Sequence, residues 1–93
     1  MPRVVVTAKV KDGAKWEKGF RTHGDLFKRQ TVNKPIRFAV TKENEVAILF
    51  EPDNLDKYHE VLDSKATEEA MAFDGVKRET VKIFVLDKEF DPR

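Results

Sequence analysis

The sequence has no cysteine, and this absence excludes several kinds of chemistry. Without thiols the chain has no disulfide framework, no thiol nucleophile and no thiolate metal site. It holds only two histidines, His23 and His59, and their spacing does not match a metal-binding helix, so a metal site that adds Asp25 or Glu60 to them is disfavoured. No motif predicts a cofactor.

Long apolar runs are also missing. The longest, residues 4–6 and 46–50, are far too short to cross a membrane. Met1-Pro2-Arg3 leads directly into a strand-like segment without a signal-peptide core, so we expect a cytoplasmic protein. The 93 residues, of which 40% are hydrophobic, fit one globular domain over 1–93 that ends in a charged tail at 87–93.

The net charge is small, but the charges of each sign are unevenly distributed along the chain. The net charge is +1, yet residues 1–42 hold 11 Lys and Arg against 3 Asp and Glu, and residues 43–93 hold 7 against 14. Neither half contains a run of five or more like charges. This pattern favours two halves that attract each other, within the fold or across a dimer, over a nucleic-acid surface.

The first half of the chain predicts a strand, a helix and a linker. Residues 3–10 are β-branched and alternate, which is typical of a strand. Asp12 is suited to cap a helix. The apolar stripe of that helix comprises Trp16, Phe20, His23 and Phe27. Gly19 and Gly24 weaken it, unless they mark the close approach of another element.

The second half predicts a hairpin, a helical region and a last strand. Residues 36–41 and 46–51 alternate around a short turn, so they form a hairpin. Asp53 looks like the N-cap of a helix that Asp63-Ser64 interrupts and that Gly75 ends as the C′ residue. Residues 79–86 alternate as the final strand.

The order β-α-β-β-α-β predicts an α+β, ferredoxin-like fold, in which both helical regions cover one face of a four-stranded antiparallel sheet. The helix-covered face should carry Val4, Val6, Ala8, Ile36, Phe38, Val40, Val46, Ile48, Phe50, Val81, Ile83 and Val85.

The opposite face of the sheet is unusually apolar for a surface open to water. It carries Val5, Thr7, Ala39, Thr41, Ala47, Leu49, Phe84 and Leu86 among a few charges. Such a face suggests burial against a second copy of the chain, so we expect a homodimer. Its interface should comprise Val5, Ala39, Ala47, Leu49, Phe84 and Leu86.

The element order, and above all residues 52–76, resembles the dimeric α/β-barrel superfamily of antibiotic-biosynthesis monooxygenase-like and muconolactone isomerase-like proteins. The similar features are the Pro-Asp-x-Leu-Asp-Lys helix start, Ser64, Ala70-Met71 and Gly75-Val76. The resemblance implies two ferredoxin-like subunits that pair sheet against sheet as a barrel. It carries no shared catalytic signature. The haem-degrading branch of the superfamily has an Asn on the first strand and a Trp after the hairpin. This chain does not fit that branch, because its first strand offers Thr7 and its only Trp, Trp16, lies on the first helix.

Five residues are candidates for a site between helices and sheet. His23 and His59 are candidate catalytic bases, since histidine titrates near neutral pH. Trp16, Tyr58 and Thr7 are candidates to line a cavity for an aromatic or oxygenated molecule. The alternative is that His23 is a buried histidine with one hydrogen bond, and that the aromatic residues are simply core.

Three functions follow, and the sequence leaves open whether the chain is an enzyme. The first is a homodimeric barrel that binds a small apolar or aromatic molecule. The second is a cofactor-independent monooxygenase- or isomerase-type enzyme with a histidine base. The least favoured is an anion- or nucleic-acid-binding module. That module would use Lys15, Lys18, Arg21, Lys28 and Arg29.

Overall fold

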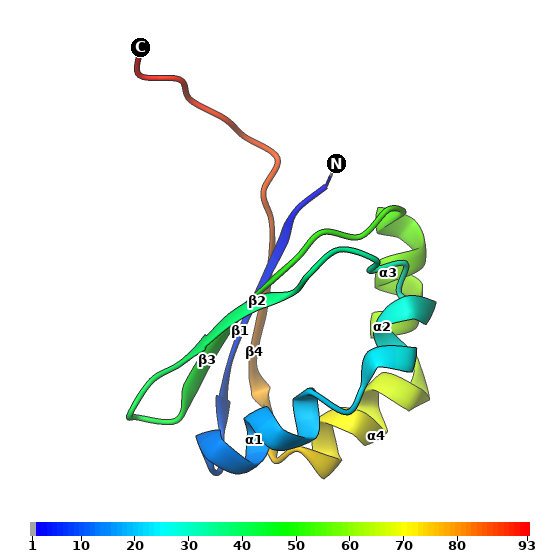
Figure 1. Ribbon diagram of the computed structural model, residues 1–93, viewed down its shortest axis with the longest axis vertical. Coiled ribbons are helices and arrows are strands. Elements are labelled where there is room, and N and C mark those ends of the chain that lie inside the picture. Colours follow the sequence, from blue (N-terminus) through cyan, green and yellow to red (C-terminus); the bar gives the residue numbers. More distant parts are fainter. Residues whose placement is uncertain (1) are drawn as a thin grey trace.

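The computed structural model describes residues 2–93, which form a four-stranded antiparallel sheet with its helices on one face (Figure 1). The strands are β1 (Val4–Val10), β2 (Arg37–Val40), β3 (Glu45–Phe50) and β4 (Val76–Val85), in the spatial order β2-β3-β1-β4. The helices are α1 (Gly13–Phe20), α2 (Gly24–Arg29), α3 (Leu55–Leu62) and α4 (Lys65–Phe73). The predicted ferredoxin-like fold is confirmed, but each helical region is two helices.

The first helical region breaks between α1 and α2, so the prediction of one continuous helix is wrong. Asp12 caps α1 as predicted, because its carboxylate accepts from two backbone N–H groups. The chain then leaves the helix at Thr22, whose hydroxyl donates to the Gly19 carbonyl at 2.6 Å. Gly19 and Gly24 flank the break and favour it through their low helix propensity. His23 therefore lies at the N-cap of α2 rather than on a helix stripe.

Helix α3 begins one residue later than the sequence predicts. Asn54 is its N-cap and accepts from the Lys57 N–H at 2.9 Å. Asp53, the predicted cap, instead accepts from Asn33 Nδ2 at 2.7 Å. The reason is tertiary: the Thr31 carbonyl and hydroxyl accept from the backbone N–H groups of residues 53 and 54 and hold this segment in place.

Helix α4 begins and ends where the sequence indicates. Ser64 is its N-cap and accepts from the Thr67 N–H, so the predicted interruption at Asp63-Ser64 is confirmed. Gly75 has a φ of +75° and follows the C-cap Asp74, as expected for a C′ glycine. These caps place Asp74 where α4 meets β4.

The sheet alternates as predicted between a helix-covered face and an open face. On β1, Val4 and Val6 are 0% and 5% exposed beneath the helices. Of the twelve residues expected on this face, six are buried and five more pack partly against them. The exception is Ile83, which is 41% exposed although it pairs opposite Val6. Strand β4 lies at the edge of the sheet, so one flank of Ile83 has no neighbouring strand.

Strand β4 begins at Val76, three residues earlier than predicted, because Val76 pairs with Val10. Its register shifts midway: Thr7 lies opposite Lys82, but Lys9 lies opposite Lys77. The extra residues bulge from the ladder, and the Thr80 hydroxyl accepts from the Lys9 N–H at 2.8 Å. Beyond β4 the chain leads away from the sheet (Figure 1).

Candidate functional site

A cavity of about 70 Å³ lies between the helices and the sheet. Strands β1, β3 and β4 form its floor, and side chains from all four helices form its walls. Roughly 10–15 Å³ of such space holds one water molecule. The cavity therefore has room for a few waters, and an aromatic ring, which needs roughly 150 Å³, enters only when the walls move apart.

Aromatic side chains surround most of this cavity. Trp16 and Phe20 stack with ring centroids 4.7 Å apart, and Phe20 lies 5.0 Å from Phe27. On the other side Phe50 lies 5.6 Å from Tyr58. These rings are core and cavity wall at once, because they bury large apolar surfaces and also face the open space.

Three buried polar atoms at this cavity have no hydrogen-bond partner within residues 2–93: Gln30 Oε1, Tyr58 OH and Asp74 Oδ1. The amide nitrogen of Gln30 does find a partner, the Thr67 hydroxyl at 3.4 Å. A buried polar group without a partner costs about 1–3 kcal/mol of folding free energy. A molecule in the cavity that offers a donor or an acceptor removes this cost.

His23 and Asp74 form a hydrogen-bonded pair at one end of the cavity. His23 Nε2 lies 2.9 Å from Asp74 Oδ2, and the two side chains are 20% and 4% exposed. Burial raises the pKa of the Asp74 carboxyl, and the charge and hydrogen bond of His23 oppose that rise. A histidine oriented by a buried carboxylate is the arrangement that general bases use.

Gly19 makes room for this pair. A Cβ atom at Gly19 would overlap Asp74 Oδ1, so α1 and the end of α4 approach each other only because residue 19 has no side chain. The predicted close approach at Gly19 is therefore confirmed. Gly24 shows no such contact, since nothing lies within 4 Å of its Cβ position.

Tyr58 faces the cavity as a neutral phenol. It is fully buried, and burial raises the pKa of its hydroxyl far above the ordinary value of 10.0. Its OH therefore remains protonated across the physiological range. It is available to donate one hydrogen bond to a molecule in the cavity.

The structure brings three of the five predicted site residues together and separates two. His23, Trp16 and Tyr58 line the cavity. His59 does not: its ring packs edge-on against Tyr58, with ring centroids 5.8 Å apart, and lies outside the lining. Thr7 lies on the open face opposite Ala47, because alternation along β1 turns it away from the helices.

Sequence reasoning missed two polar residues of the site, Gln30 and Asp74. Asp74 is 51 residues from His23 along the chain, and no local pattern joins them. Gln30 follows the last turn of α2, where a polar residue is usually exposed, yet only 2% of it is. The one available signal was Gly19, which indicated a close contact but not its partner.

Neither a metal site nor a membrane span emerges from the described residues. Within residues 2–93 no group of three His, Asp or Glu side chains could hold a metal ion. No helix in that range is long and apolar enough to cross a bilayer.

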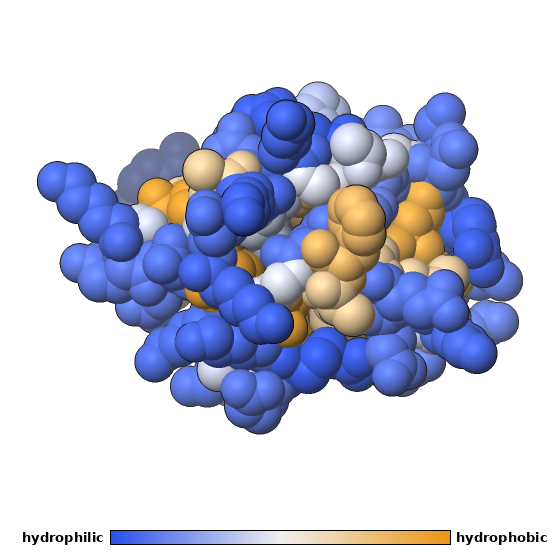
Figure 2. Space-filling model, turned by 90° about the horizontal axis from the view of Figure 1, so that it is seen from below, coloured by the Kyte–Doolittle hydropathy of each residue, from blue (hydrophilic) through white to orange (hydrophobic). Residues whose placement is uncertain are grey.

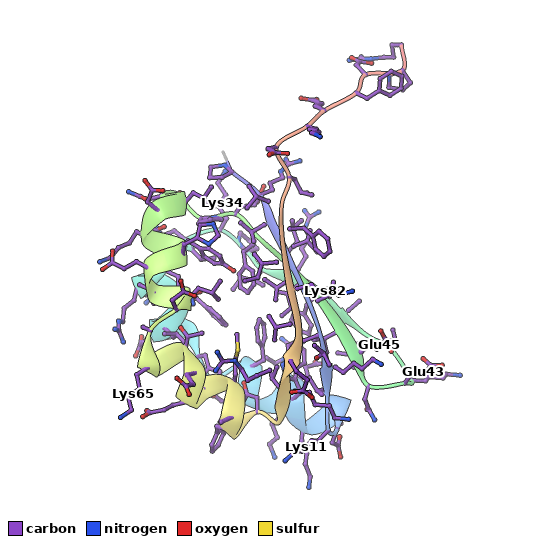
Figure 3. All side chains as sticks on the ribbon, turned by 180° about the vertical axis from the view of Figure 1, so that it is seen from behind. Lys11, Lys34, Glu43, Glu45, Lys65 and Lys82 are labelled. Carbon is purple, nitrogen blue, oxygen red and sulfur yellow. The ribbon has the colours of Figure 1, made fainter. Side chains whose placement is uncertain are left out.

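The open face of the sheet carries the six residues predicted as an interface. Val5 lies opposite both Leu49 and Phe84, Ala39 lies opposite Ala47, and the Leu86 N–H donates to the Arg3 carbonyl beside them. Phe84 and Leu86 are 49% and 52% exposed. Lys82 points away from the helices on this side (Figure 3). The face is thus apolar at its centre and charged at its margin.

Comparison with known proteins supports the fold and goes no further. No protein-family description and no curated protein matches this chain. Among solved structures, a putative antibiotic biosynthesis monooxygenase from Bordetella bronchiseptica is similar with a TM-score of 0.73 and 14% identity, over 96% of this chain and 97% of that one.

Two further solved structures have the same architecture. SnoaB from Streptomyces nogalater, a cofactor-independent oxygenase, has a TM-score of 0.70 at 14% identity, over 98% of this chain and 95% of that one. A dimeric ferredoxin-like protein from an uncultured marine organism has a TM-score of 0.57 at 14% identity, over 99% and 92%. The resemblance noted in the sequence is confirmed at the level of structure: this chain has the ferredoxin-like fold of the antibiotic biosynthesis monooxygenase-like proteins.

Proposed function

We propose that this chain binds a small aromatic molecule with a hydroxyl or carbonyl group in the cavity between helices and sheet. The observation that carries the proposal is that three polar atoms in an otherwise apolar cavity have no hydrogen-bond partner among residues 2–93. Apolar walls favour a ring, and a few fixed polar groups orient it. Tyr58 donates a hydrogen bond and Gln30 Oε1 accepts one, so a phenol satisfies both.

The fluorescence of Trp16 tests this proposal, because it is the single tryptophan and it lines the cavity. Trp16 is excited at about 295 nm, and its emission should change saturably as phenol is added. Tyr58→Phe should weaken phenol binding about fivefold, the value of one hydrogen bond, and leave toluene binding unchanged. If phenol produces no saturable change, the cavity is only a packing defect of the core.

A second candidate, a cofactor-independent enzyme, rests on the His23–Asp74 pair. When neutral His23 donates its Nε2–H to Asp74 Oδ2, the lone pair lies on Nδ1. Nδ1 can then accept a proton from a phenol or from a carbon beside a carbonyl, and Asp74 stabilises the resulting imidazolium. If the His23 imidazolium returns the proton to a different atom of the carbanion, the reaction is an isomerisation.

If the same carbanion meets O₂, the reaction is an oxygenation. One CH₂ group and O₂ then give one C=O group and one water molecule, so the substrate supplies all the electrons. SnoaB, which has the same fold, is a cofactor-independent oxygenase, and this supports the possibility. No residue beyond the base is needed to start the reaction.

Hydrogen exchange of 2-indanone in D₂O, followed by NMR, tests the base. The protein should accelerate exchange, and His23→Gln should remove about 100-fold or more of that acceleration. His59→Gln is the matched control and should leave the rate unchanged, since His59 does not line the cavity. Equal losses in both variants, or no acceleration by the wild type, would overturn the assignment. Oxygen consumption, measured with an oxygen electrode, distinguishes oxygenation from hydrogen exchange alone.

We also propose that two copies pair through the open face of the sheet. The half-exposed Phe84 and Leu86 support this, and so does the dimeric ferredoxin-like protein among the structural neighbours. Sedimentation should show a dimer at micromolar concentration, and Leu49→Lys at the centre of the face should give a monomer. Phe73→Lys, an exposed phenylalanine on α4, is the control and should remain dimeric. A wild-type monomer would contradict the proposal.

A further inference from the structure

A second hollow lies on the outer surface between α1 and the end of α4. It is a groove of about 380 Å³, lined by Lys15, Lys18, Gly19, Thr22, Phe73 and Asp74. Figure 2 views this end of the molecule, where apolar groups lie at the centre of a hydrophilic rim. Ligand sites commonly have volumes of about 300–1,000 Å³, so the groove is large enough to hold a small molecule.

The wall between this groove and the inner cavity is one side chain thick. Asp74 lines both hollows, and on the groove side it lies against Gly19, which has no side chain. The Asp74 carboxylate fills the space between the two hollows, with Oδ2 on His23 and the buried Oδ1 against Gly19. A rotation of Asp74 away from His23 would join the groove to the cavity.

The groove combines positive charge with an aromatic surface. Lys15 and Lys18 are three residues apart on α1, so they lie on the same side of the helix. Neither lysine is in a salt bridge with any carboxylate of residues 2–93, whereas Arg21 is paired with Glu17. The Phe73 ring is 78% exposed, and it lies edge-on to His23 at 6.5 Å.

We infer that this groove is the entrance to the cavity and that it selects small aromatic acids. The carboxylate of the ligand lies between the ammonium groups of Lys15 and Lys18. The ring passes Phe73 and enters the cavity when Asp74 rotates. This inference rests on the proposed binding function and adds to it the charge of the ligand and the route it takes.

Three related probes test the inference: 4-hydroxybenzoate, its neutral amide 4-hydroxybenzamide, which has nearly the same shape, and phenol, which lacks the para substituent. Their dissociation constants are measured by Trp16 fluorescence and their positions by ¹⁵N chemical shifts. The wild type should bind the acid about tenfold more tightly than the amide, about threefold for each lysine, as partly exposed ion pairs allow. Salt should reduce this preference.

The double variant Lys15→Gln/Lys18→Gln should bind acid and amide equally well, with phenol binding unchanged. Its control is Lys28→Gln/Arg29→Gln, which removes the same charge from α2, outside the groove, and should keep the preference. An equal preference in both double variants, or shift changes that avoid α1 and the end of α4, would overturn the inference.

The outcomes also separate the two proposals. If phenol and the amide bind in the cavity without any preference for the acid, the entrance inference fails and the binding function stands. If none of the three probes binds, both fail.

Discussion

Phe50 and Leu49 are neighbours on β3, yet their surroundings differ completely. Phe50 is 4% exposed, and it faces the helices and contacts Phe20, Phe27 and Tyr58. Leu49 faces the opposite side, where its neighbours are Val5 and Arg37 on the adjacent strands. One step along a strand thus moves a side chain from the closed interior to a surface that only a second molecule could cover.

The largest expected effect on stability comes from truncating a buried side chain on the helix-covered face of the sheet. Phe50→Ala should lower the free energy of unfolding by about 3–5 kcal/mol, because it removes a buried ring and leaves a cavity. Leu49→Ala, measured in urea at a protein concentration too low for pairing, should cost about 1 kcal/mol. Equal losses would mean that both faces are core in the single chain.

A smaller effect should follow from adding one methyl group to the helix-covered side. Gly19→Ala places a Cβ atom against Asp74 Oδ1, so the carboxylate must move, at a cost of about 1–3 kcal/mol in unfolding free energy. The His23 signals in NMR should shift as the pair separates. Gly24→Ala has open space around it and should be neutral or stabilising by up to about 1 kcal/mol. A stable Gly19→Ala variant with an unchanged His23 would contradict the close approach.

The pH dependence of stability tests the buried carboxyl. Burial raises the pKa of Asp74 above its ordinary value of 3.8, so the folded state binds this proton more tightly than the unfolded state. Stability should therefore fall as the pH rises from 3.8 through the folded pKa, by about 1.4 kcal/mol for each unit of pKa shift. Asp74→Asn should lack this loss in urea titrations at several pH values. A loss on acidification instead would show that attraction to His23 outweighs burial.

The smallest effect is expected on the open face. Phe84→Ala, at a concentration too low for pairing, should change the unfolding free energy by no more than about 0.5 kcal/mol, because the ring is 49% exposed. At high concentration the same variant should dissociate more readily than the wild type in sedimentation. A large loss at low concentration would show that Phe84 belongs to the core of one chain.

Local patterns in the sequence were sufficient to predict the faces of the sheet and most helix ends. Alternation placed Val4 and Val6 against the helices, and the cap Asp12 and the interruption at Asp63-Ser64 were visible in the sequence. The N-cap of α3 was missed because it depends on Thr31, which is 23 residues away. Local propensity cannot encode such a contact.

The candidate site was predicted only in part, for the same physical reason. Trp16, Tyr58 and His23 carry side chains whose chemistry is visible in the sequence, and all three line the cavity. The partner of His23 depends on how α4 lies against α1, which is a matter of tertiary packing. The break between α1 and α2 was likewise hidden, because an apolar stripe continued across it.

The bulge in β4 bears on how copies of this chain can associate. An exposed edge strand offers unpaired backbone groups to any other chain, and regular edges can grow into fibres. Here the shifted register opposite Thr7 and Lys9 interrupts the outer edge, and Arg78, Glu79, Thr80 and Val81 occupy the interruption. Strand-by-strand growth along this edge is therefore obstructed. The proposed pairing through the open face differs in kind, because a twofold pairing closes on itself and stops at two copies.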